Sequence, residues 1–139
     1  MSHFEQSPVK KCSSCKEIKT LDNYGIHSNG KHRPQCKTCV TERHYERKYG
    51  ITLEDYNQMY EEQGGVCKIC HLPANHNSNK LCVDHDHATG EVRGLLCDTC
   101  NRGLGYFKDD TRLLQNSIEY LEANARRLQG LSAGIMAST

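Results

Sequence analysis

The sequence predicts a small α+β fold, and three observations lead to this expectation. First, short apolar runs with strand character alternate with segments whose apolar residues follow a helical period. Second, hydrophobic residues make up 36% of the 139 residues, with two Phe and no Trp, so the core is thin and needs other support. Third, eight of the nine cysteines form four Cys-x2-Cys pairs, a spacing that lets two thiolates bind one zinc ion. We therefore expect a zinc-stabilised α+β protein.

Turn and capping residues place the first elements. Residues 1–40 are rich in Cys, Lys and turn residues, and Asn29-Gly30 predicts the tip of a hairpin. A charged helix is expected at 41–49, where Gly50 ends it. The first third of the chain is thus a cysteine-rich module followed by a connecting helix.

The middle of the chain predicts a helix and then two strands. Thr52 resembles a helix N-cap, with Asp55 three residues later at the spacing of a capping box, and two consecutive glycines end this helix. Short strands are expected at 81–84 and 92–96, joined through turn residues at 88–90. A strand–turn–strand unit therefore follows the second helix.

A short helix is expected from near Cys97 to Gly103 or Gly105, with Tyr106 and Phe107 packed beneath it. The last helix is expected at 111–128, and the tail from residue 130 onward is expected to fray. Its apolar stripe consists of Leu114, Ile118, Leu121, Ala125 and Leu128.

These elements predict three parts of the chain. Residues 1–50 would form an N-terminal four-cysteine zinc module with its connecting helix. Residues 51–110 would form a core unit around the second set of cysteine pairs, and 111–139 a C-terminal helix and tail.

The formal charge of +1 hides an asymmetry. Residues 1–50 carry ten Lys and Arg against five Asp and Glu, whereas the remainder carries eight against twelve. A basic N-terminal third suits a polyanionic partner, although a solvated charged surface explains the charge equally well. No apolar leader or membrane-length apolar run is visible, so we expect a cytoplasmic, intracellular protein with no membrane partner.

The paired cysteines predict two structural zinc sites, because four thiolates complete a tetrahedral shell and leave no open position. The first set is Cys12, Cys15, Cys36 and Cys39, and the second is Cys67, Cys70, Cys97 and Cys100. Other divisions of the eight cysteines, and an iron–sulfur or redox role, remain open at this point. So does zinc ligation by the nearby histidines His27, His32, His71 and His76. The ninth cysteine, Cys82, is expected to be a small buried apolar residue.

The segment Asp84-His85-Asp86-His87 is the candidate chemical site. Four titratable residues in a row are costly to bury and unsuited to packing, and they directly follow an apolar strand. Asn101 follows the last paired cysteine, so a zinc site would hold it near this segment. The oxygens of Asp84 and Asn101 suit Mg²⁺ or Mn²⁺, and a neutral His85 beside the metal could take a proton from an attacking water. A polar surface turn, or a metal site without catalysis, is the alternative.

This pattern resembles the recombination endonuclease VII family of HNH, or His-Me finger, nucleases. The resemblance runs from about residue 56 to 110, and the N-terminal module is similar to a zinc module often found ahead of such nuclease domains. The motifs that carry it are Cys67-x2-Cys70, Asp84-His85-x-His87 and Cys97-x2-Cys100-Asn101. The resemblance implies a ββα-metal unit braced by a four-cysteine zinc, and a metal-dependent, single-metal DNA endonuclease that a phage or mobile element could encode.

The resemblance also implies roles for individual residues. Asp84 and Asn101 would hold the catalytic Mg²⁺ or Mn²⁺, and His85 would be the general base that activates water. His87 would be an accessory catalytic residue, near the scissile phosphate or supporting the site. The products would carry a 5′-phosphate and a 3′-hydroxyl.

Leu104 departs from the family pattern, because the namesake carries an acidic residue four positions after its last zinc cysteine. Glu91 or Asp98 would be the candidates to replace it. The namesake's long dimerisation helices are not evident either, although a homodimer is expected if both strands of DNA are cut. Alternatives to a junction resolvase are a restriction or homing-type nuclease, a packaging-associated nickase, and a non-catalytic zinc module that binds nucleic acid.

Overall fold

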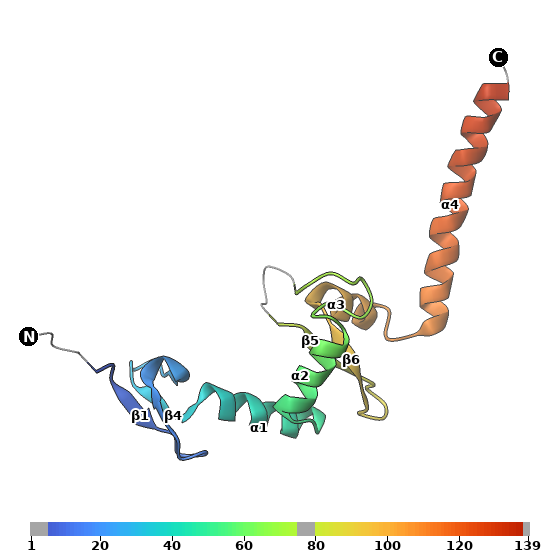
Figure 1. The fold of residues 1–139 in the computed structure, drawn as a ribbon. Coiled ribbons are helices and arrows are strands. Elements are labelled where there is room, and N and C mark those ends of the chain that lie inside the picture. The colour runs from blue at the N-terminus through green and yellow to red at the C-terminus, as the bar shows by residue number, and fades with distance from the viewer. Residues whose placement is uncertain (1–5, 75–79, 138–139) are drawn as a thin grey trace, which may run out of the picture.

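The fold was analysed in a computed structural model that describes residues 6–74 and 80–137, with side chains up to residue 130. The α+β class predicted from the sequence is confirmed, with short antiparallel hairpins and helices following one another along the chain (Figure 1). Of the described residues, no helix is long and apolar enough to cross a membrane.

Two small antiparallel hairpins form the N-terminal module. They consist of β1 (Val9–Lys11) with β2 (Ile18–Thr20), and β3 (Tyr24–Ile26) with β4 (His32–Cys36), separated by the 3₁₀ turn Leu21–Asn23. The second hairpin turns at Asn29-Gly30, as predicted, and Gly30 adopts a left-handed φ of 79° there. The buried residues of this module are Cys12, Cys36 and Tyr24, whose hydroxyl donates to the carbonyl of Lys10 at 2.6 Å. Cysteines therefore make up most of this small core.

Helices α1 (Lys37–Tyr49) and α2 (Leu53–Glu62) connect this module to the rest of the chain. Helix α1 ends as predicted at Gly50, which has a left-handed φ of 68°. It begins four residues earlier than predicted, at Lys37, because β4 leads into it through Cys36 as the N-cap. The capping box predicted for α2 is present, with hydrogen bonds of 2.8 and 3.0 Å.

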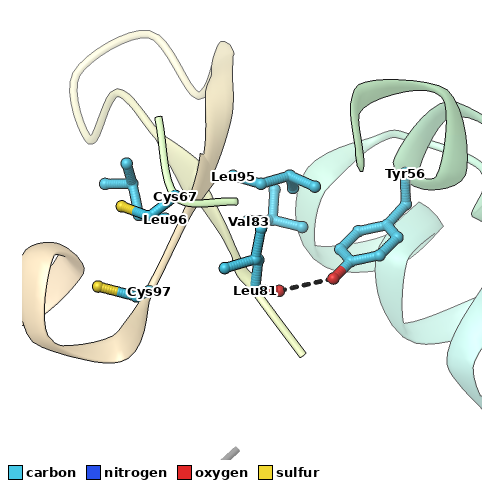
Figure 2. Packing of buried hydrophobic residues seen from close by; sticks show 7 residues of the cluster. All are labelled: Tyr56, Cys67, Leu81, Val83, Leu95, Leu96 and Cys97. Carbon is cyan, nitrogen blue, oxygen red and sulfur yellow. Dashed lines mark hydrogen bonds between the residues drawn. The ribbon is translucent and has the colours of Figure 1, made fainter. Parts of the chain in front are cut away.

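A third hairpin consists of β5 (Cys82–His85) and β6 (Val92–Leu96), and helix α3 (Asp98–Tyr106) follows it. These three elements form the hairpin unit. Both strands lie within one residue of their predicted positions. An apolar cluster packs the hairpin against α2, where the Tyr56 hydroxyl donates to the carbonyl of Leu81 at 2.8 Å (Figure 2). The buried members of the cluster are Tyr56, Cys67, Leu81, Val83, Leu95, Leu96 and Cys97.

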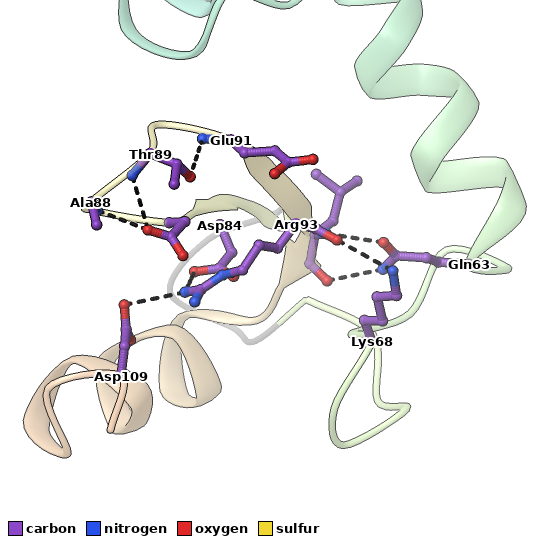
Figure 3. A network of polar contacts seen from close by, with 10 residues as sticks. Gln63, Lys68, Asp84, Ala88, Thr89, Glu91, Arg93 and Asp109 are labelled. Atoms are coloured by element: carbon purple, nitrogen blue, oxygen red, sulfur yellow. Dashed lines mark hydrogen bonds and ion pairs between the residues drawn. The ribbon is translucent and has the colours of Figure 1, made fainter. Parts of the chain in front are cut away.

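Gln63, directly after α2, binds the edge of β6 with its side-chain amide. Its Nε2 donates to the carbonyls of Val66 and Leu95, and its Oε1 accepts from the Leu95 N–H, all at 2.9 Å (Figure 3). The amide thereby replaces the neighbouring strand that this part of β6 lacks. A Cβ on Gly94 would lie 2.9 Å from Lys68 Cδ, so a glycine there lets Lys68 lie close against the strand.

Helix α4 (Thr111–Ala137) extends away from the hairpin unit, and Asp110 caps it by accepting from the N–H groups of Arg112 and Leu113 (Figure 1). The predicted end near residue 128 was wrong, since the helix continues to Ala137. The packing predicted for Tyr106 and Phe107 was also wrong: their exposed fractions are 82% and 38%.

Candidate active site

The structure brings the eight paired cysteines into two clusters. In each cluster the four sulfurs lie within 4.8 Å of one another, in the grouping that the sequence predicted. The Sγ atoms of Cys12 and Cys39 are 3.9 Å apart, and those of Cys70 and Cys97 are 3.8 Å apart. Four sulfurs at about 2.3 Å from a tetrahedral zinc are about 3.8 Å apart. Both clusters therefore have sulfur spacings close to those of a four-thiolate zinc site.

Backbone N–H groups in the Cys-x2-Cys turns stabilise thiolates in both clusters. The N–H of Cys36 donates to the Cys12 sulfur at 3.3 Å, and this bond is the main cause that lowers the pKa of Cys12 to about 6. For Cys67, burial opposes ionisation, but N–H donors outweigh it and lower the pKa to about 6. Burial and neighbouring thiolates raise the pKa of Cys39 and Cys100 to about 12. A bound cation would offset that accumulated negative charge.

The sequence left open whether histidines bind zinc and what role Cys82 has. Among the described residues, no histidine joins either cysteine cluster. His76 lies outside the described residues. Cys82 is half-buried in β5 and belongs to neither cluster, and burial raises the pKa of its thiol.

A β-bulge shapes the hairpin at the predicted site. Asp84 pairs with Gly94, but the next residue, His85, pairs with Val92, so Arg93 is the extra residue on β6. The bulge turns the Arg93 side chain toward β5. This local irregularity, invisible in the sequence, brings an arginine onto the predicted metal-binding carboxylate.

Arg93 holds Asp84 with a two-pronged contact (Figure 3). Arg93 Nε donates to Asp84 Oδ2 at 2.7 Å, and Arg93 Nη2 donates to Asp84 Oδ1 at 2.9 Å. Asp84 is only 8% exposed, and the hydrogen bond to its carboxylate is the main cause that raises the pKa of Arg93 above its ordinary value. The guanidinium thus satisfies both oxygens of the buried carboxylate.

Asp109 is a second carboxylate at this site, and the sequence analysis missed it. It accepts from Arg93 at 3.3 Å, so Arg93 bridges Asp84 and Asp109. Lys108 and Asp109 have left-handed φ values of 56° and 53°, in the turn that follows α3. Asp109 follows no helical or strand period that could have marked it, and two consecutive left-handed non-glycine residues are uncommon.

The residues considered as substitutes for the missing acid lie elsewhere. Asp98 pairs with Arg102 one helical turn along α3, at 3.2 Å. Glu91 lies in the turn between the strands, and among the described residues it forms no ion pair with Arg93. Leu104 packs against the apolar cluster and, with Asp84, lines a hollow of about 320 Å³. Asp109 is therefore the carboxylate best placed to compensate for Leu104.

His85 and His87 lie side by side at the end of β5, with ring centroids 4.8 Å apart. His85 is half-buried, and the ring of Tyr49 from the end of α1 meets it edge-on at 5.4 Å. His87 is exposed. Between them, the Asp86 carboxylate accepts hydrogen bonds from the N–H groups of Thr89 and Ala88 and so closes a turn. These hydrogen bonds lower the pKa of Asp86. Asp86 is therefore a structural residue of the turn.

Asn101 lies in the first turn of α3, directly after Cys100, and α3 contacts β5. Its backbone N–H donates to Cys97, whereas its side-chain amide has no hydrogen-bond partner within the described part of the chain. The second cysteine cluster thus fixes Asn101 on the element that packs against the Asp84 strand.

A polar hollow of about 460 Å³ lies beside these residues. Its side chains include His87, Arg93, Lys108 and Asp109. Asp86 lines the hollow as well, so its charged side chains are two cations and two carboxylates beside an exposed histidine. Such a mixed polar lining can contact both the phosphate oxygens of a ligand and a metal ion.

The model of the family described as recombination endonuclease VII matches residues 42–123, more than half of the chain. The chain belongs to the recombination endonuclease VII family. The family suggested by the sequence motifs is thereby confirmed, and the match covers α2, the β5–β6 hairpin and α3 completely.

Two curated relatives of this endonuclease VII family member come from phages. The Gene 59 protein of Mycobacterium phage D29 is 54% identical over 74 residues, which are 52% of this chain and 44% of that protein. The Gene 59 protein of Mycobacterium phage L5 is 53% identical, with the same shares. The chain therefore spans less than half the length of these relatives. Among solved structures, the ββα-Me type II restriction endonuclease Hpy99I matches at 31% identity and a TM-score of 0.39, covering 84% of this chain and 66% of that one.

Proposed function

We propose that this protein is a metal-dependent DNA endonuclease, of the HNH or His-Me finger type, whose site is built on Asp84, His85 and Asn101. The observation that carries the proposal is the bulged end of the β5–β6 hairpin. There a buried carboxylate, two neighbouring histidines and an arginine lie beside a polar hollow. Family membership supports the same chemistry.

The donor groups fit Mg²⁺ or Mn²⁺ at Asp84 and Asn101. Each Asp84 oxygen accepts one N–H from Arg93, which leaves lone pairs for an ion, and the Asn101 amide is unengaged within the described residues. Both donors are hard oxygens, and Mg²⁺ usually takes one or two protein ligands while substrate oxygens complete its shell. When bound, such an ion supplies charge stabilisation for the scissile phosphate and the leaving oxygen.

His85 would act as the general base. A ring nitrogen accepts a proton from water as the water oxygen attacks phosphorus. The bond to the 3′ oxygen breaks, and that oxygen takes a proton from a second water. The products are a 5′-phosphate and a 3′-hydroxyl. Tyr49 restricts the His85 ring from one side, and His87 and Lys108 offer donors to phosphate oxygens. Zinc in the second cysteine cluster would keep α3 and the β5–β6 hairpin in register.

The test is plasmid cleavage by the zinc-loaded protein with Mg²⁺ or Mn²⁺. Wild type is expected to nick or linearise the plasmid, and His85→Ala to lower the rate by about 10²–10⁴, the usual contribution of a general base. His27→Ala is a matched control, because His27 is exposed in the β3–β4 turn. Equal inertness of wild type and His85→Ala, with two zinc ions bound in each, would support a non-catalytic zinc module instead.

The DNA form that is cut decides the finer assignment. A panel of plasmid, linear duplex, branched DNA and single strand separates a junction resolvase from a site-specific cutter or a nickase. We propose that the protein acts as a homodimer when both strands are cut. Ile118, Leu121 and Leu128 on α4 are 47, 66 and 53% exposed, so they are available for such a contact. Sedimentation tests the dimer.

A further inference from the structure

A basic groove of about 640 Å³ lies between β4 and α1, away from the proposed catalytic residues. Four cationic side chains and one histidine line it: Arg33, Arg43, Arg47, Lys80 and His44. None of its described lining residues is acidic. Three of the ten lysines and arginines in residues 1–50, together with Lys80, therefore lie on one concave surface.

Helix α1 separates its charges by face. Arg43 and Arg47 are one helical turn apart and line the basic groove, whereas Glu42 and Glu46 precede them by one residue and line hollows shared with α2. One residue along a helix turns the side chain by about 100°. The acidic residues therefore lie on a different face of the helix and do not line the groove.

One arginine of the groove, Arg43, is held by neutral partners. Arg43 donates to Gln35 Oε1 at 3.2 Å and to Ser14 Oγ at 3.3 Å. Among the described residues, no carboxylate pairs with Arg33, Arg43 or Arg47, unlike Arg93 at the catalytic site. Neutral hydrogen bonds orient the Arg43 guanidinium while its charge stays available to an anion.

Helix α1 also links the groove to the catalytic site. Arg43 lies in the middle of this helix and Arg47 in its last turn. Its last residue, Tyr49, contacts His85 with ring centroids 5.4 Å apart. Figure 1 shows α1 between the N-terminal hairpins and the rest of the chain. The rise from Arg43 to Arg47 is about 6 Å. One strand of duplex DNA rises about 3.4 Å per nucleotide along its axis, so the rise between the two arginines matches about two nucleotides of one strand.

We propose that this groove binds consecutive backbone phosphates of duplex DNA next to the cleaved bond. The N-terminal zinc module then serves as a DNA-docking part in addition to stabilising the fold. The inference rests on the proposed nuclease function for its choice of DNA, and it assigns substrate contacts to residues outside the family motifs. Because phosphate contacts carry no sequence information, the groove contributes affinity and register rather than sequence specificity.

The experiment measures binding apart from cleavage. The zinc-loaded full chain is titrated onto a fluorescein-labelled duplex without Mg²⁺ or Mn²⁺, at several salt concentrations, and Kd is read from anisotropy. The test variant is Arg43→Gln/Arg47→Gln. The control is Lys11→Gln/Lys31→Gln, which removes the same charge from exposed positions outside the groove. Zinc content and far-UV circular dichroism confirm that every variant is folded.

Each lost phosphate contact lowers the salt slope by about 0.9 and weakens binding about eightfold at 0.1 M salt. The test variant is therefore expected to lose about 1.8 in slope and about sixtyfold in affinity, while the control stays within about twofold of wild type. Arg43→Lys/Arg47→Lys is expected to keep most of the affinity, because it retains both charges.

Equal Kd values and salt slopes for the test and control variants would overturn the proposal that the groove binds DNA, even if wild type cleaves DNA. Tighter binding to anionic lipid vesicles than to duplex, through the same arginines, would also overturn it. If His85→Ala leaves cleavage unchanged but the groove variant still loses binding, the catalytic proposal fails and the groove stands. With Mg²⁺ present, the groove variant is expected to raise KM and leave kcat within about twofold.

Discussion

Replacing Arg93 tests how the protein manages a buried carboxylate at its proposed metal site. Arg93→Gln removes the two charge-assisted hydrogen bonds to Asp84, at 2.7 and 2.9 Å. Such bonds contribute about 1.5–3 kcal/mol each, and the lower end applies because the Arg93 side chain is 36% exposed. The metal-free variant should therefore lose about 3 kcal/mol of unfolding free energy.

Millimolar Mg²⁺ or Mn²⁺ should restore part of this loss, because a cation at Asp84 replaces the missing guanidinium charge. By mass action, the metal then stabilises Arg93→Gln more than wild type. Arg93→Lys serves as the control that keeps the charge but loses the two-pronged geometry, and it should recover about half of the loss. Asp109→Asn removes only the longer 3.3 Å contact and should cost below about 1 kcal/mol.

The assay is urea unfolding of the zinc-loaded protein, followed by tyrosine fluorescence and circular dichroism, with and without the divalent ion. A loss below about 1 kcal/mol for metal-free Arg93→Gln would refute the argument that Arg93 compensates a buried charge. Equal stabilisation of wild type and variant by the metal would refute the placement of the ion at Asp84.

Three further predictions concern the frame of the site. Tyr56→Phe removes the 2.8 Å hydrogen bond to the buried Leu81 carbonyl and should cost about 1–2 kcal/mol in urea unfolding; no change would show that water replaces it. Gln63→Leu removes three hydrogen bonds at 2.9 Å and should speed hydrogen exchange of the Leu95 amide, whereas unchanged exchange would contradict the edge-capping role. Cys67→Ala should lower the zinc content from two ions to one and unfold the hairpin unit, and a folded variant that keeps two ions would contradict the assigned cluster.

Local signals explain most of what was predicted correctly about the fold. The capping box at Thr52 and Asp55 and the left-handed Gly50 act within a few residues, so their side chains define helix ends directly. The same local signals failed for Tyr106, whose side chain is 82% exposed although it was expected to pack beneath α3. An aromatic residue in the sequence does not indicate whether another element will cover it. Burial depends on which distant segments pack together, and local patterns do not record that.

The candidate site also combines features that the sequence predicts with contacts that only the tertiary structure shows. The sequence by itself determined which cysteines pair, because two intervening residues impose the geometry of a shared ion, and it marked Asp84, His85 and Asn101 by their chemistry. Only the tertiary structure decided which cations and carboxylates surround them. The bulge at Arg93 and the left-handed turn at Asp109 join segments sixteen residues apart, and such contacts depend on how strands and helices pack in space rather than on any sequence period.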